Sequence, residues 1–298
     1  MNSPYEDELI QNLKEVSWED YLEQSKKMIP YWIFRGQSYK EPTMRCLMSR
    51  FERALISYQI PLSDAPGIEN LMIRDFRRKY EGIDSEVVSK DTLYCLSLMQ
   101  HYGCPTRLLD CTYSPYIAAF FAVEDMSLEQ KAKRNAFVFC LSHKWINESA
   151  KGNINDDALF KKRFDDKTIT NESFIDLYMG EKEKSFIVAE NPHQLHRRLS
   201  IQKGVFIIQG DISKSMIENI KSMNGWQSKK SLILYKLKIN TEEELKKVYE
   251  DLRLMNITHE SLFPGLDGFS KSLKQNLYWY QELPAIKANV IPFTPGHI

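Results

Sequence analysis

The chain has 298 residues, of which 43% are hydrophobic, and its 40 basic side chains are balanced by 40 acidic ones. This composition excludes a disordered or fibrous protein, and the balanced charge gives no overall field that would attract nucleic acid or an anionic membrane. Five cysteines without a CxxC pair, an amino terminus unlike a signal peptide and the lack of a long apolar run predict a cytoplasmic protein with reduced thiols, no zinc site and no membrane partner.

The first predicted elements are a helical segment and a strand. Residues 1–28 carry apolar side chains at helical spacing, and Ser17 is placed to cap a second helix within this N-terminal helical segment. Residues 31–37 (YWIFRGQ) are aromatic and β-branched, so they predict a short strand. Arg35 and Gly36 are expected where this strand leaves the sheet.

A mostly helical layer is predicted next, followed by several strands. Helical spacing covers residues 44–60, 69–80 and 90–103, and Ser114 with Pro115 is a typical start of another helix. Short apolar runs predict strands at residues 135–142, 184–190, 204–210 and 231–239, and helices follow over 240–255 and 258–275. Residues 143–183 are rich in Lys, Asp, Asn and Ser and are expected to be an insertion with a helix or two. Because strands do not alternate regularly with helices, the sequence favours a single α+β domain over 1–298, with short mixed or antiparallel sheets flanked by helices.

Residues 98–115 (LMQHYGCPTRLLDCTYSP) hold more polar side chains than a helix-to-strand connection requires. The segment 106–112 is short enough to be a strand with its leucines buried and its polar residues at the rims. We expect the polar residues of this stretch to line a ligand cleft: His101, Tyr102, Thr106, Arg107, Asp110, Thr112 and Ser114. Two alternatives stay open. Arg107 and Asp110 either pair with each other or contact a ligand, and His101 either acts as an acid or base or caps backbone carbonyls.

Two further clusters suit an anionic ligand. Arg35 supplies planar donors for phosphate or carboxylate, and the missing side chain of Gly36, with Gln37 following, lets a ligand approach the backbone. The alternative is an arginine paired to a structural carboxylate beside a turn glycine. In the second cluster, two arginines and an amide precede the strand at 204–210 and are expected to converge on the same ligand: Arg197, Arg198 and Gln202. The nearby histidines lack a third ligand for a metal.

Four segments resemble the FRG domain family of bacterial and phage proteins, which is named for a Phe-Arg-Gly motif. They are residues 32–37 (WIFRGQ), 98–122, 197–206 and 260–273. The resemblance extends from about residue 18 to 275 in order and spacing. Cys111 stands where the family usually has tryptophan, which is expected to change packing rather than chemistry.

The order of the motifs is also similar to the ADP-ribosyltransferase superfamily, which implies an ADP-ribosyltransferase-like fold. The resemblance implies that Arg35 and Gly36 hold NAD, that Thr112 and Ser114 belong to the middle motif, and that Gln202 opens the third. Gly204 departs from this pattern, because the superfamily has its catalytic glutamate there. Asp110, Glu190 and Asp211 are the carboxylates considered for its place.

The expected function is therefore an anionic-ligand or nucleotide cleft with NAD as a substrate and no metal. As an enzyme, the protein would transfer ADP-ribose or cleave NAD, in a bacterial toxin or in anti-phage defence, with Arg35, Asp110 and Gln202 as the catalytic candidates. The alternative is a non-catalytic module that binds a nucleotide or an anionic peptide end. The sequence leaves a protein or nucleic-acid target open and does not identify one.

Overall fold

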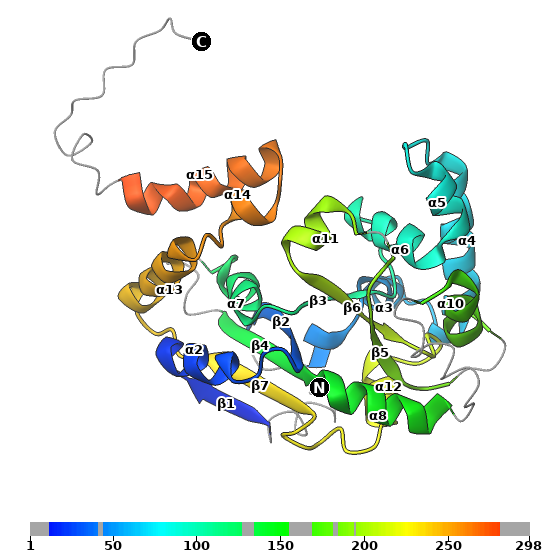
Figure 1. Ribbon diagram of the computed structural model, residues 1–298, viewed down its shortest axis with the longest axis horizontal. Coiled ribbons are helices and arrows are strands. Elements are labelled where there is room, and N and C mark those ends of the chain that lie inside the picture. The colour runs from blue at the N-terminus through cyan, green and yellow to red at the C-terminus, as the bar shows by residue number, and fades with distance from the viewer. Residues whose placement is uncertain are drawn as a thin grey trace, which may run out of the picture.

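A seven-stranded mixed sheet runs through the part of the chain that the computed structural model describes, and helices cover both of its faces (Figure 1). The described residues are 12–40, 44–126, 134–154, 169–180, 184–193 and 195–280. The strand order is β1-β7-β4-β2-β3-β6-β5, in which β1 and β7 are parallel and all other pairs antiparallel. The strands are β1 (Leu13–Val16), β2 (Trp32–Tyr39), β3 (Leu109–Thr112), β4 (Asn135–Ser142), β5 (Ile187–Glu190), β6 (Gly204–Gln209) and β7 (Leu232–Leu237).

Most of the longer helices form two layers, one on each face of the sheet. One layer holds α2 (Trp18–Lys26), α7 (Pro115–Val123) and α13 (Glu242–Leu254), and the other holds α6 (Thr92–His101), α8 (His143–Ile154), α10 (Asn171–Tyr178) and α12 (Met216–Lys221). The remaining elements are η1 (Met44–Leu47), α3 (Arg50–Ser57), η2 (Leu62–Asp64), α4 (Ala65–Lys79), α5 (Ser85–Lys90), α11 (Arg197–Ile201), α14 (His259–Leu262) and α15 (Leu266–Tyr280). The predicted α+β class is confirmed. None of the described helices is long and apolar enough to cross a lipid bilayer.

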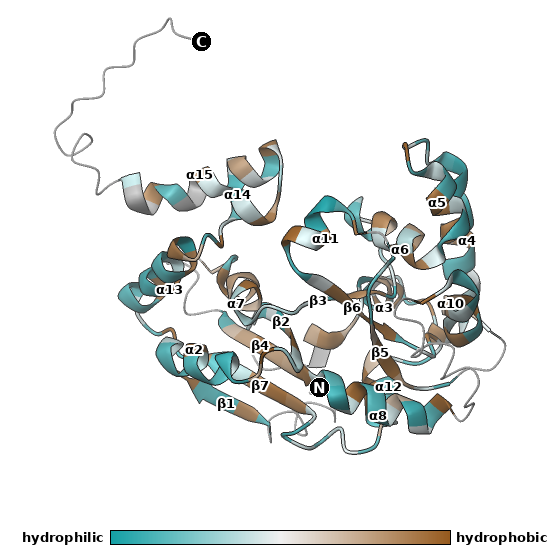
Figure 2. Cartoon of the chain, viewed as in Figure 1, coloured by the Kyte–Doolittle hydropathy of each residue, from teal (hydrophilic) through white to brown (hydrophobic). Residues whose placement is uncertain are grey.

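The two largest hydrophobic clusters lie on opposite faces of the sheet, as alternate residues of β4 show. Phe137 and Phe139 belong to the cluster packed by α6, α8 and α10, whereas Val138 and Cys140 belong to the cluster packed by α2, α7 and α13. All four side chains are buried because helices cover both faces. In Figure 2 the central strands are accordingly brown, while the outer sides of α2 and α13 are teal.

The ladder between β2 and β3 is almost absent. Phe34 pairs with Thr112, and this is the only residue pair that joins the two strands, although β2 pairs with β4 from Trp32 to Tyr39 and β3 pairs with β6 along its whole length. The two strands therefore diverge, and the sheet is split between them. The candidate site lies beside this split.

Two predictions about the beginning of the chain need correction. Leu13–Val16 form β1 rather than a helix, because their backbone pairs with β7; residues 1–11 lie outside the described part. Ser17 does cap α2 as predicted, accepting a hydrogen bond from the Asp20 amide at 3.1 Å. Arg35 and Gly36 do not leave the sheet, because β2 continues to Tyr39 and both residues pair with β4.

Parts of the segment 143–183 contribute to the core. Trp145 and Ile146 of α8 and Phe174 of α10 are buried in the cluster that also contains Phe137 and Phe139. Residues 155–168 and 181–183 lie outside the described part, and the assignment of 143–183 as an insertion stays a prediction.

Candidate functional site

A pocket of about 380 Å³ opens beside the split between β2 and β3. Three carboxyl groups and five cationic side chains line it: Asp110, Glu124 and Asp125, with Arg35, Arg50, Arg53, Arg198 and Lys271. Distant parts of the chain meet here, since β2, α3, β3, α7, α11 and α15 all contribute. Of the residues predicted from the sequence, the pocket brings together Arg35, Gly36, Gln37, His101, Asp110, Thr112, Arg198 and Gln202.

Arg35 spans the split in the sheet. Its Nη1 donates to the carbonyl oxygen of Asp110 in β3 at 2.5 Å, and its Nε donates to the carbonyl oxygen of Cys46 in η1 at 2.8 Å. The side chain thus supplies a connection between β2 and β3 where the backbone ladder is missing. The partners are carbonyl oxygens, not the structural carboxylate considered as an alternative, so the guanidinium keeps its positive charge beside the pocket.

Gly36 is required by the close approach of a helix. A Cβ at this position would lie 1.6 Å from the carbonyl oxygen of Ala118 and 2.8 Å from the amide nitrogen of Ala122. Helix α7, which carries both alanines, therefore crosses β2 directly over Gly36. Gly36 also lines the pocket, so the approach of a ligand to its backbone stays a prediction.

Asp110 presents an oriented carboxylate to the pocket. Oδ1 accepts a 2.6 Å hydrogen bond from Gln100, whose own carbonyl oxygen accepts from the Thr106 hydroxyl. Oδ2 lies 3.4 Å from Nη2 of Arg50, and the Asp110 side chain remains 48% exposed. One oxygen is thus anchored by neutral donors, while the other faces the arginine and the pocket.

Thr112 of β3 and Gln202, which follows α11, link β3 to the segments around it through hydrogen bonds. The Thr112 hydroxyl donates to the carbonyl oxygen of Gln202 at 2.8 Å and accepts from the amide of Ser114 at 3.0 Å. The Gln202 amide donates to the carbonyl oxygen of Leu262 at 3.1 Å, which holds α14 against the pocket. Ser114 caps α7 through the amide of Ile117, as the sequence predicted, and does not line the pocket.

Three other predicted ligand residues lie away from the pocket. Arg107 is 1% exposed and is bound by Glu69 at 2.8 Å and by the carbonyl oxygen of Tyr178 at 2.7 Å. It pairs with Glu69 and not with Asp110, because the chain before β3 packs into the core against α4 and α10. Thr106 is also buried, and Tyr102 is exposed at the end of α6.

A family model of the FRG domain matches residues 30–131. The chain contains an FRG domain. Neither the curated proteins nor the solved structures gave a match. The FRG domain contributes Arg35, Arg50, Arg53, Asp110 and Glu124 to the pocket, whereas α11 and α15 complete the wall from outside the matched residues.

Five charged pocket residues escaped the sequence analysis: Arg50, Arg53, Glu124, Asp125 and Lys271. In the sequence, Arg50 and Arg53 look like part of the polar face of an amphipathic helix. Their spacing of three residues places both on one face of α3, and this spacing was the signal that could have indicated a shared site. Glu124 follows α7 directly and is easily taken for a surface residue. Within the FRG domain, the motif arginine is thus one of three arginines at the pocket.

The pKa of Glu124 is raised from 4.5 to about 7. Burial is the largest cause and the negative charge of Asp125 adds to it, whereas Lys271 and Arg198 oppose the shift. His259 of α14 lies close by, with Nε2 at 3.9 Å from a Glu124 oxygen. Near neutral pH both protonation states of Glu124 are populated, which suits a group that donates or accepts a proton.

Two histidine rings that line the pocket lie close to each other. The rings of His101 and His196 are 5.0 Å apart between centroids, and Nδ1 of His196 caps α11 by accepting from the Leu199 amide at 3.2 Å. Burial, together with His101 and Arg198, lowers the pKa of His196 to about 4. His196 is therefore neutral at pH 7, as its role as a cap requires.

The pocket continues into a second lobe of about 470 Å³ between α11 and α15. The two share His101, His196, Arg198, Phe263 and Lys271. The Arg198 guanidinium lies over the Phe263 ring at 4.4 Å and so forms the partition. Arg197 lines the second lobe, so of the two predicted arginines Arg198 alone reaches the main pocket.

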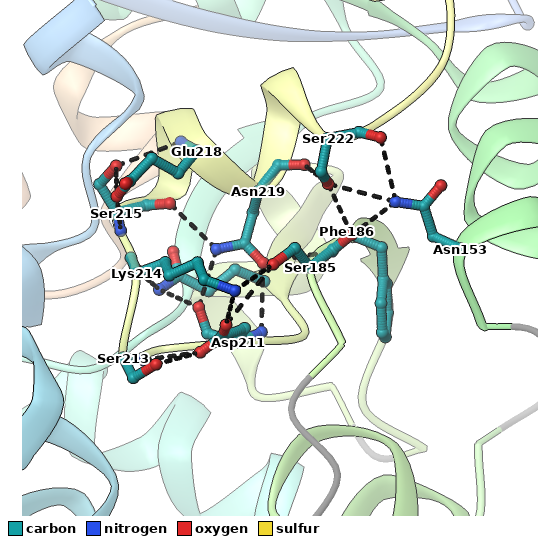
Figure 3. Close-up of polar contacts among 11 residues, drawn as sticks. Asn153, Ser185, Phe186, Asp211, Ser213, Lys214, Ser215, Glu218, Asn219 and Ser222 are labelled. Carbon is teal, nitrogen blue, oxygen red and sulfur yellow. Dashed lines mark hydrogen bonds and ion pairs between the residues drawn. The ribbon is translucent and has the colours of Figure 1, made fainter.

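The other carboxylates considered for the place of Gly204 have structural partners. Figure 3 shows Asp211 in a network that joins β6 to α12, in which it accepts from the Ser213 amide at 3.0 Å and pairs with Lys214 at 2.8 Å. Glu190 is buried and accepts from the Tyr178 hydroxyl at 2.6 Å. Among the described residues, no three His, Cys, Asp or Glu side chains gather as metal ligands would.

Proposed function

We propose that the pocket binds a nucleotide through its phosphate groups, with NAD as the first candidate. The convergence of Arg50, Arg53, Arg198 and Lys271 on one pocket carries the proposal. Guanidinium groups match the geometry of phosphate oxygens and bind them with charge-assisted hydrogen bonds. Arg35 contributes its charge while its hydrogen bonds hold β2, β3 and η1 in place.

The base of the nucleotide is assigned to the rim of the pocket. The His101 ring lines the pocket and contacts the exposed ring of Tyr102 at 5.3 Å between centroids, and Tyr102 also contacts Tyr80 and Phe76. Aromatic rings of this kind stack on nucleobases with little preference for their identity. Phosphates in the pocket and a base beside it would use both the charged lining of the pocket and the aromatic rings next to His101.

A second candidate function is cleavage of the bond between ribose and nicotinamide, and the pair Asp110 and Glu124 favours it. In this reaction the bond between C1′ and the nicotinamide nitrogen breaks, and its electron pair leaves with nicotinamide. Asp110 stabilises the positive charge that develops on the ribose, and the ionised Glu124 accepts the proton of the water that adds to C1′. ADP-ribosyl transfer differs only in that an acceptor group replaces water. Loss of cellular NAD by either route would suit a toxin or an anti-phage effector.

Calorimetry with pyrophosphate, AMP, ADP and NAD tests the binding proposal. We expect saturable binding that Arg53→Gln weakens by roughly 10- to 100-fold, because a charge-assisted hydrogen bond contributes about 1.5–3 kcal/mol. Arg78→Gln, at an exposed arginine of α4 outside the pocket, is the matched control and should bind normally. Absence of heat with all four compounds, or equal affinities of Arg53→Gln and wild type, would exclude phosphate binding in this pocket.

Release of nicotinamide from NAD separates an enzyme from a binding module. An enzyme should release nicotinamide, and Asp110→Asn should slow release while leaving ADP affinity within a few fold. A module that binds NAD without turnover would show saturable heat and no product. The absence of a side chain at Gly204 supports the module, because a Cβ there would lie 2.2 Å from Leu199 and no acid fits without displacing it.

A further inference from the structure

An apolar stripe runs along one side of α15. Its large apolar side chains are between 36% and 81% exposed: Leu266, Phe269, Leu273, Leu277 and Tyr280. They are spaced by three, four, four and three residues, close to the repeat of about 3.5 residues by which one helix packs along another. Gly268 and Ser272 lie on another side of the helix and are buried, with Gly268 packed against the backbone of Phe263. The stripe thus faces away from the body of the protein.

The stripe is symmetric about Leu273. Reading outward from this residue, apolar side chains occur four and seven residues away in both directions. A two-fold axis through Leu273 would therefore place it against the partner's Leu273, Phe269 against the partner's Leu277, and Leu266 against the partner's Tyr280. Two-fold interfaces require such a self-complementary surface, whereas a small ligand or a lipid surface does not.

We propose that α15 pairs antiparallel with α15 of a second copy of this chain. The 3.5-residue spacing specifies a helix as the occupant, and the symmetry specifies the same helix in the opposite direction. The pairing also acts on the pocket, because Lys271 of the same helix lines its wall. A dimer therefore holds in place a helix that completes the site, whatever ligand the pocket takes.

Cysteine cross-linking under mild oxidation tests the register. Leu273→Cys should form a disulfide dimer several-fold more readily than Leu254→Cys, an exposed leucine of α13 outside the stripe. Leu266→Cys alone should not cross-link, but it should do so when combined with Tyr280→Cys. The wild-type chain gives the background, since its cysteines are buried or half-buried.

Sedimentation equilibrium provides the second measurement. The wild type should dimerise with increasing concentration, and Leu273→Glu should stay monomeric because two carboxylates would meet on the axis, whereas Leu254→Glu should behave like wild type. A wild type that is monomeric throughout, or equal cross-linking of Leu273→Cys and Leu254→Cys, would overturn the proposal. A monomeric wild type is the expected outcome if residues 281–298 of the same chain cover the stripe. Efficient self-cross-linking of Leu266→Cys would overturn the antiparallel register.

Discussion

Gly36 of β2 and Ala118 of α7 are so close that a Cβ on the glycine would lie 1.6 Å from the alanine carbonyl oxygen. The Arg-Gly pair of the FRG motif therefore has two separate structural tasks. The arginine joins β2 to β3, and the glycine allows α7 to lie on the sheet.

Gly36→Ala should destabilise the protein by at least about 1–3 kcal/mol, because the helix or the strand must move to accept the methyl group. Urea unfolding followed by circular dichroism measures the change. Gly67→Ala in α4 is the control, since a Cβ there meets nothing within 4 Å. A Gly36→Ala variant as stable as Gly67→Ala would contradict the close packing.

Arg35 and Arg53 should differ in what they support. Arg35→Ala leaves two carbonyl oxygens without their donor and should lower the free energy of unfolding by about 1–3 kcal/mol. Arg53→Ala should change stability by less than about 0.5 kcal/mol, as expected of a partly exposed side chain, yet weaken pyrophosphate binding. Urea midpoints and calorimetry on both variants decide the matter. Equal losses of stability would show that Arg53 is structural as well.

The buried pair of Arg107 and Glu69 should matter for stability and not for the ligand. Arg107→Met leaves a buried carboxylate without its partner and should cost about 3–5 kcal/mol. Lys27→Met removes one member of an exposed pair with Glu23 and should cost less than about 1 kcal/mol. At a temperature where Arg107→Met remains folded, its affinity for ADP should equal that of wild type. A selective loss of affinity would restore Arg107 as a ligand residue.

Glu124 should make stability and binding depend on pH. Between pH 4.5 and about 7 the folded protein retains a proton on Glu124 that the unfolded chain has lost, so this group lowers stability as the pH rises through that range. Glu124→Gln removes the effect and should exceed wild type in stability by about 1–3 kcal/mol at pH 8, with little difference at pH 4.5. Its affinity for a phosphate ligand at pH 8 should also be higher, because a negative charge is gone.

Urea titrations of wild type and Glu124→Gln between pH 4.5 and 8 measure this difference. Glu52, whose pKa is also raised to about 7 by burial, contributes equally to both proteins. Glu260→Gln, at an exposed position of α14, controls for the loss of a surface charge. Parallel pH curves for wild type and Glu124→Gln would refute the raised pKa.

His196 should act in the opposite sense. Its pKa is lowered to about 4, so the unfolded chain binds a proton that the folded protein lacks between about pH 4 and 6.5. The stability associated with the neutral His196 cap is therefore lost as the pH falls through this range. His196→Asn keeps a capping group without a titrating ring and should flatten that part of the stability curve. An unchanged slope would show that His196 does not cap α11 in its neutral form.

Local patterns were sufficient to predict most elements. The strand predicted at residues 135–142 is β4 with the same bounds, and Ser114 begins α7 as expected, because both depend on residues close in sequence. β1 could not be predicted in this way, since its four residues are extended only through their pairing with β7, more than two hundred residues later. The prediction failed where a tertiary contact decided the local structure.

The candidate site was predictable in outline only. Polar residues of three motifs do meet, but a sequence does not tell which side of a strand faces a pocket and which faces a core. Arg107 and Asp110 are three residues apart, yet one is locked in the core and the other lines the pocket. Arg50 and Arg53 show the reverse case, because they occupy positions typical of a helix surface and yet line the pocket, where Arg50 reaches Asp110 of β3.

Because a single residue pair joins β2 to β3, the sheet consists of two halves, β1-β7-β4-β2 and β3-β6-β5, with a narrow junction between them. Elsewhere neighbouring strands are joined by main-chain bonds that any residue provides, so substitutions leave the connection intact. Between β2 and β3, a hydrogen bond from the Arg35 guanidinium takes the place of such main-chain bonds, so the orientation of the two halves of the sheet depends on one side chain. The shape of the pocket beside this junction therefore depends on the side chain of Arg35, and not on main-chain hydrogen bonds that any residue could make.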